Sequence, residues 1–154
     1  MNKRPESNGN DVSVAVLPQS ACFVCGPDNT RGLRLRFENC KSGESVAEWI
    51  PEKFTEGFRG IVHGGIVSTV LDEAMSQAVA AAGLPALTAE LRVRLRHHVP
   101  STCLVQVRGW INSHAGRLIK TEAAITDSEG IELAHAWASF LTVKGTVQTS
   151  TDED

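Results

Sequence analysis

The segment 63–82, HGGIVSTVLDEAMSQAVAAA, constrains the fold more than any other part of this 154-residue chain. On a helix at 100° per residue, its apolar side chains cover more than half of the circumference. These side chains are Ile66, Val67, Val70, Leu71, Ala74, Met75, Ala78 and Val79. So wide an apolar arc is typical of a helix that is buried on most sides, and not of one that rests on a flat sheet. We therefore expect the rest of the chain to curl around this helix.

Two glycines, Gly64 and Gly65, occupy the first turn of the predicted helix. Glycine costs about 1 kcal/mol relative to alanine in a helix interior, so a pair at this place requires a reason. Without side chains there, the unpaired amides at the positive end of the helix dipole are open to close approach by a carbonyl oxygen. The pattern indicates an oxyanion hole, with an ordinary turn before a helix as the alternative.

Two neighbouring carboxylates, Asp72 and Glu73, lie on the polar arc of the same helix. Adjacent acids usually form a solvated face, but on so apolar a helix an unpaired carboxylate is costly without a role or a partner. The helical wheel does not choose between them. Asp72 lies about 10 Å along the axis from Gly65, too far for both to act on one carbonyl carbon. Two antiparallel helices would bring Gly65 of one chain to Asp72 of another, so the motif predicts a homodimer.

Outside the helix, the sequence alternates with the period of β-strands. We predict strands at 33–38 and 45–50 before the helix and at 88–99, 103–111, 118–126 and 131–143 after it, with a loop at 52–62. This order is typical of an α+β fold in which a curled antiparallel β-sheet wraps around one long central helix.

Composition indicates one domain at 21–144, flanked by a polar leader (1–20) and an acidic tail (145–154) that we expect to be disordered. The net charge of −3 carries no basic excess that would suggest nucleic acid as a partner. The leader has neither the pattern of a signal peptide nor that of a membrane span, so no membrane association is expected. Four irregularly spaced cysteines favour a reducing cytoplasm.

Cys22 and Cys25 have the spacing of half a zinc site. No second pair at ligand spacing follows, and the adjacent His97 and His98 would point to opposite faces of a strand. We therefore predict packed thiols, no bound metal and no cofactor, with structural zinc as the alternative.

Several motifs resemble, in order and spacing, those of the hotdog-fold thioesterases of the phenylacetate (PaaI-like) type. They are the triplet His63-Gly64-Gly65 with an acid nine positions after the histidine, CFVCGPDN from 22, GL at 32, LDEAM from 71, TAEL from 88 and GR at 116. The resemblance covers 22–144 and implies a hotdog fold. It also implies hydrolysis of an acyl-CoA or acyl-carrier thioester by a homodimer or a dimer of dimers (homotetramer). The spacing from the histidine to the acid is unlike that of the hotdog dehydratases.

By this resemblance, the Gly65 amide polarises the thioester carbonyl, and Asp72 of the partner subunit acts as general base or nucleophile. Glu73 is the alternative carboxylate. His63 is a further catalytic candidate, for binding the oxygen of the acyl group, with a role in shaping the loop as the alternative. The residues expected to bind substrate are Gly64, Ser76 and, for the phosphates of coenzyme A, Arg94, Arg96 and Arg117.

One position departs from the pattern of the family. Many relatives carry Asn or Gln six residues before the histidine, to position the water or the carbonyl, and this chain has Gly57 there. A non-catalytic acyl-CoA-binding protein is therefore the second hypothesis, and a zinc-tethered interaction module is the third. The sequence contains no Gly-x-Ser-x-Gly elbow, no P-loop and no dinucleotide-binding Gly-x-Gly-x-x-Gly, so other enzyme classes are unsupported.

Overall fold

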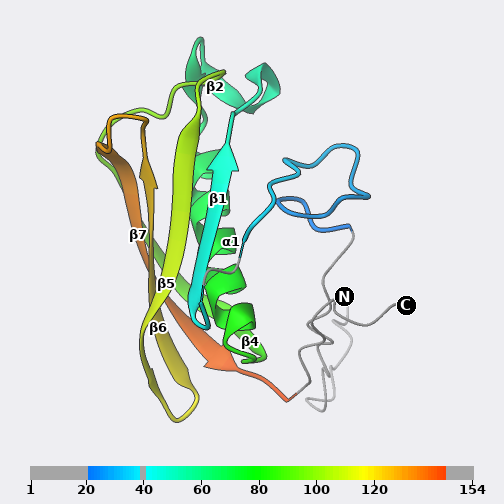
Figure 1. The fold of residues 1–154 in the computed structure, drawn as a ribbon, viewed down its shortest axis with the longest axis vertical. Helices are drawn as coiled ribbons and strands as arrows, with labels where there is room; N and C mark the ends of the chain where they lie inside the picture. Colours follow the sequence, from blue (N-terminus) through cyan, green and yellow to red (C-terminus); the bar gives the residue numbers. More distant parts are fainter. Residues whose placement is uncertain (1–20, 39–40, 145–154) are drawn as a thin grey trace, which may run out of the picture.

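The computed structural model describes residues 21–38 and 41–144, so the predicted leader and tail lie outside the described residues. It contains a five-stranded sheet of order β1-β5-β6-β7-β4, with antiparallel neighbours, and a separate two-stranded hairpin of β2 and β3 (Figure 1). The strands are β1 (Glu44–Trp49), β2 (Glu56–Phe58), β3 (Ile61–Val62), β4 (Ala86–Leu95), β5 (Val105–Ala115), β6 (Leu118–Thr126) and β7 (Glu132–Thr142). A 3-10 turn, η1 (Lys53–Thr55), precedes β2, and the helix α1 (Gly64–Ala81) follows β3.

Helix α1 lies against one face of the curled sheet (Figure 1). Seven of its eight predicted apolar residues are buried, and the eighth, Ile66, is half-buried. His63 caps the start of the helix, and Gly83, with φ of 73°, follows its end. The structure thus confirms the predicted α+β architecture of a central helix wrapped by an antiparallel sheet. Among the described residues, no helix is both long and apolar enough to cross a membrane.

Around Ala74, helix α1 comes close to strands β1 and β5 of the sheet. The Ser45 hydroxyl of β1 donates a hydrogen bond to the Ala74 carbonyl of α1 at 2.6 Å. Beside it, a Cβ atom added to Gly109 of β5 would lie 2.2 Å from the same carbonyl oxygen. The glycine therefore allows α1 to seat directly on the sheet.

The predicted strand at 33–38 is wrong. Its alternation of burial is present, since Leu33 and Leu35 are buried and Arg34 is exposed, but the backbone forms no regular strand. The amides of Leu33 and Leu35 donate to the carbonyls of Phe23 and Val24 at 2.7 and 2.8 Å, so the preceding loop takes the place of a neighbouring strand. Arg34 has φ of 54°, which interrupts an extended chain.

The segment 52–62, predicted as a loop, contains η1 and the hairpin β2–β3. Gly60 turns this hairpin with φ of 77°, and the His63 amide donates to the Thr55 carbonyl at 2.8 Å, which fixes the entry into α1. The four strands predicted after the helix are confirmed, with ends shifted by up to four residues.

Strand β4 is more exposed than its sequence predicted. Its alternation indicated a strand with one buried face, yet Leu87, Leu91 and Leu95 are 48%, 38% and 52% exposed. In the described sheet its one neighbour is β7, so the other edge of β4 is free. A long edge strand with exposed apolar side chains is typical of a surface that another chain covers.

Candidate active site

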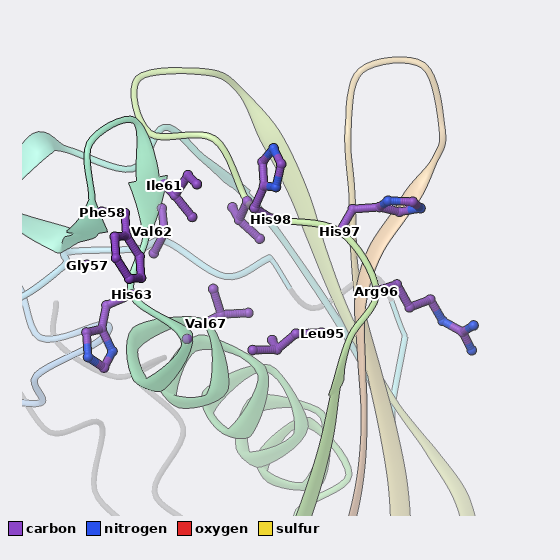
Figure 2. A pocket seen from close by; sticks show the side chains of 12 residues that line it. Gly57, Phe58, Ile61, Val62, His63, Val67, Leu95, Arg96, His97 and His98 are labelled. Carbon is purple, nitrogen blue, oxygen red and sulfur yellow. The ribbon is translucent and has the colours of Figure 1, made fainter.

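A pocket of about 450 Å³ opens at the N-terminal end of α1, between the β2–β3 hairpin and the end of β4 (Figure 2). In Figure 2, the Leu95 side chain points toward α1, where Val67 lies, whereas the side chains of Arg96 and His97 point away from the helix. The full lining consists of Gly57, Phe58, Ile61, Val62, His63, Gly64, Val67, Leu95, Arg96, His97, His98 and Val99. The pocket therefore joins an apolar interior to a polar rim.

The two glycines at the start of α1 have different surroundings. A Cβ atom on Gly64 would lie 2.9 Å from Leu95 Cδ1, so the end of the Leu95 side chain would have to shift to admit it. The Gly65 amide donates to His63 Nδ1 at 2.9 Å. Within residues 21–38 and 41–144, the Gly64 amide has no acceptor. The predicted use of the Gly65 amide as an oxyanion donor therefore requires the His63 ring to turn away.

Gly57 lies directly against His63. A Cβ atom at Gly57 would approach the Cα and Cδ2 atoms of His63 to 3.2 Å, which is tighter than ordinary contact. A side chain at this position would require His63 to shift by a few tenths of an ångström.

Asp72 is half-buried on α1 and is held by Thr88 of β4, whose hydroxyl donates to Asp72 Oδ1 at 2.8 Å. Burial raises the pKa of this carboxyl group above its usual value, the Thr88 hydrogen bond lowers it in part, and the charge of Glu73 raises it further. A carboxylate with a raised pKa is a stronger base than an exposed one. Ser76 is half-buried one turn further along the helix.

Glu73 faces a different part of the molecule. Its Oε1 atom accepts a hydrogen bond from Gln77 Nε2 at 2.9 Å, and its Oε2 atom lies 3.8 Å from Cys22 Sγ. Burial raises the pKa of the neighbouring Cys25 thiol, and the charge of Glu73 raises it further. The structure thus separates the two carboxylates that the helical wheel left equivalent.

The three predicted phosphate-binding arginines do not form one group in the single chain. Arg96 lies at the pocket, and its Nε atom forms an ion pair with Glu132 Oε1 at 3.1 Å. Arg94 is exposed on β4. Arg117 lies beyond the other end of β4, where it donates to the Thr142 carbonyl at 3.2 Å.

Sequence analysis missed Thr88 as a site residue and missed the apolar contribution of Phe58 and Leu95. The signal for Thr88 was the TAEL motif, which was used for the resemblance but not for the site. In the single chain, Gly65 and Asp72 remain about 10 Å apart along one helix, so one chain does not bring them together.

Comparisons with known proteins agree with the fold. The family model of the thioesterase superfamily matches residues 59–134, which include the glycine pair, Asp72 and Thr88. A search of curated proteins gives no match. Among solved structures, a thioesterase superfamily protein is 25% identical with a TM-score of 0.76, over 79% of this chain and 60% of that one.

Two further solved structures have the same fold at lower identity. The Escherichia coli PaaI protein, from the phenylacetic acid degradation operon, is 14% identical with a TM-score of 0.71, over 75% of this chain and 84% of that one. The smu.793 protein of Streptococcus mutans UA159, bound to acetyl CoA, is 14% identical with a TM-score of 0.69, over 74% of this chain and 91% of that one. The chain is thus a hotdog-fold protein. Its residues 59–134 are similar to the thioesterase superfamily.

Proposed function

We propose that the protein hydrolyses an acyl-CoA or acyl-carrier thioester to a free acid and a thiol, in a homodimer whose sites combine residues of both chains. The observation that carries the proposal is the setting of Asp72. It is a half-buried carboxylate with a raised pKa that accepts a hydrogen bond from the Thr88 hydroxyl, on a helix that begins with two glycines. The thioesterase superfamily match over the same residues supports this chemistry.

The reaction follows from these groups. The amides at the start of α1, Gly65 foremost, bind the carbonyl oxygen of the thioester and stabilise the negative charge that develops on it. Asp72 of the partner subunit takes a proton from the attacking water, or attacks the carbonyl carbon itself. On the general-base route, Asp72 passes this proton to the thiolate as the carbon–sulfur bond breaks, which gives the free acid and the thiol. On the nucleophilic route, the thiolate leaves and takes a proton from solvent, and water then hydrolyses the mixed anhydride formed with Asp72. Before the carbonyl oxygen can bind, the His63 ring has to release the Gly65 amide, which donates to its Nδ1 atom in the free chain.

The free edge of β4 supports a second copy of the chain as the partner. Its exposed leucines offer an apolar surface, and its open backbone edge can pair with another strand. A dimer with antiparallel α1 helices supplies the Asp72 that the glycine end of each chain lacks. A dimer of dimers is compatible with the same sites.

The pocket supports an apolar acyl group. Phe58, Val67 and Leu95 line its interior, and Arg96 stands at its rim for a phosphate of coenzyme A. Gly64 and Ser76 would contact the acyl chain along α1, while Arg94 and Arg117 are placed for the phosphates only if the partner brings them near. The acetyl CoA bound to the smu.793 protein and the operon of the PaaI protein support a coenzyme A thioester of the phenylacetate-related type.

Release of free thiol from a panel of short, medium, long and aryl acyl-CoAs tests the proposal. We expect turnover of at least one member, detected with a thiol reagent, and saturation at micromolar to millimolar substrate. Free coenzyme A should compete with substrate. Absence of turnover on the whole panel would contradict the proposal.

Gly57 favours one second candidate, a non-catalytic acyl-CoA-binding protein. Glycine at this position, beside His63, supplies no polar side chain that could hold the attacking water or the thioester carbonyl. Binding of an acyl-CoA in calorimetry without any thiol release would establish this candidate in place of hydrolysis.

Thr88→Val should reduce kcat/KM at neutral pH by about tenfold, because a hydrogen bond to a charged group is worth about 1.5 kcal/mol. The Thr88 hydroxyl lowers the pKa of Asp72, so its removal should also move the acid limb of the pH profile to higher pH. Thr88→Ser keeps the hydroxyl and is the matched control, with a profile close to that of the wild type. A profile unmoved in Thr88→Val would show that the hydrogen bond does not tune the base.

A further inference from the structure

A cluster of metal-ligand atoms lies beside α1, outside the residues that the proposed hydrolysis uses. The Sγ atoms of Cys22 and Cys25 and a carboxylate oxygen of Glu73 all lie within 4.8 Å of one another. The cysteines belong to the loop before β1, and Glu73 belongs to α1, 51 residues after Cys22. All three residues are half-buried.

We propose that Cys22, Cys25 and Glu73 bind one zinc ion that ties the loop at 21–38 to α1. At a Zn–S distance of about 2.3 Å and a Zn–O distance of about 2.1 Å, tetrahedral ligand atoms lie about 3.6–3.8 Å apart. Cys22 Sγ and Glu73 Oε2 lie 3.8 Å apart, so these two atoms already have the spacing of a zinc site.

The charge of Glu73 supports a cation at this place. In the described part of the chain the Glu73 carboxylate has no ion pair, and its polar partners are the Gln77 amide and the weak thiol donor of Cys22. A half-buried carboxylate is stabilised by a bound cation. Gln77 Nε2 also lies 3.5 Å from Cys25 Sγ, so one amide supports two of the ligands, as the residues around metal ligands commonly do.

The donor set favours zinc over other ions. Two thiolates at Cys-x-x-Cys spacing disfavour magnesium and calcium, which bind oxygen ligands, and the carboxylate distinguishes the site from one built for Cu(I). Half-exposed cysteines leave the fourth position open to a water molecule. A disulfide between Cys22 and Cys25 is the alternative chemistry, but it would give the Glu73 carboxylate no new partner.

The ion would act on structure and not on the thioester. The loop at 21–38 contributes Val24, Leu33 and Leu35 to the hydrophobic core, and zinc would fix its start to the middle of α1. Glu73 neighbours Asp72 in sequence, but Asp72 bonds to Thr88, so the metal and the proposed base face different surroundings.

Metal binding to the full chain, reduced and stripped of metal with a chelator, tests the inference without any activity assay. We expect one equivalent of zinc per chain by elemental analysis, and tetrahedral cobalt absorption with thiolate charge-transfer bands when Co²⁺ replaces zinc. Cys22→Ser and Cys25→Ser should each weaken Co²⁺ binding and reduce the intensity of the thiolate bands, because one of the two thiolates is removed. Glu73→Gln should weaken zinc binding by at least about tenfold, because even residues that only support metal ligands contribute about tenfold to a hundredfold to metal affinity.

Two variants are matched controls. Cys103→Ser removes an exposed cysteine outside the cluster, and Asp72→Asn removes the neighbouring carboxylate, so both should bind zinc like the wild type. Substoichiometric zinc on the reduced wild type would overturn the site, as would unchanged affinity in Glu73→Gln. If the protein forms a Cys22–Cys25 disulfide and does not take up zinc after reduction, the two cysteines are a redox pair and the zinc site is excluded. Thioester turnover has no bearing on any of these outcomes, so the two proposals fail separately.

Discussion

Asp72→Asn is expected to lower kcat/KM for thioester hydrolysis by about a hundredfold or more, the effect of losing a general base. The amide keeps the size of the side chain and can still bond to the Thr88 hydroxyl, but it cannot take a proton from water or attack the carbonyl carbon. Steady-state thiol release by wild type and variant, on the best acyl-CoA of the panel, measures the change. Glu73→Gln tests the alternative base, and because its carboxylate faces the cysteines, turnover should fall much less than in Asp72→Asn.

The pH dependence of Asp72 gives this prediction a second readout. A base must be ionised, so wild-type kcat/KM should rise with pH through the raised pKa of Asp72, and this limb should vanish in Asp72→Asn. Because the folded pKa lies above the unfolded one, the native state binds the proton more tightly, and ionisation reduces stability as pH rises between the two values. Above the folded pKa, Asp72→Asn should therefore melt at the same temperature as the wild type or higher. If Asp72→Asn melts at a lower temperature than the wild type, its loss of activity is due to a destabilised fold. If the variant keeps its activity, Glu73 is the base instead.

The parts of the fold that the sequence predicted well are those whose burial depends on local periodicity. The arc of α1 from Val67 to Val79 carries its own pattern, and so do the strands after it, because neighbours in sequence share a face. The strand predicted at 33–38 shows the limit of that reasoning. Its side chains alternate correctly, but a strand also needs a neighbouring strand for its amides, and the loop at 23–24 takes that place.

The site was predictable only as far as the helix that carries it. The glycine pair and Asp72 lie within one helix, so their spacing along the axis, and the need for a second chain, follow from helical geometry. Contacts that join distant segments do not. Thr88 meets Asp72 from 16 residues away, and Cys22 meets Glu73 from 51 residues away. Ligands at local spacing did not complete a zinc site in the sequence, because the third ligand of the proposed site comes from the distant helix α1.

Gly109→Ala is expected to reduce the free energy of unfolding by about 3 kcal/mol or more, at or above the upper end of the usual cost of overpacking a core. The added Cβ atom would lie 2.2 Å from the Ala74 oxygen, 2.5 Å from the Ala74 carbonyl carbon and 2.9 Å from the Met75 nitrogen. These are backbone atoms of α1, so no rotamer change relieves the contact and the helix must move off the sheet. Urea denaturation of the two proteins measures the difference.

Gly116→Ala is the control for Gly109→Ala, because it adds backbone strain without a collision between the new Cβ atom and its neighbours. Gly116 turns the β5–β6 hairpin at φ of 59° with open space around it, so alanine there should cost only about 1 kcal/mol, the cost of the left-handed conformation. The same movement of α1 that destabilises Gly109→Ala should draw Asp72 away from Thr88, so its turnover should fall more than that of Gly116→Ala. Equal losses of stability in the two variants would show that the backbone of α1 does not collide with a side chain at position 109. The close packing of α1 against Gly109 would then not contribute to the position of Asp72, the proposed base.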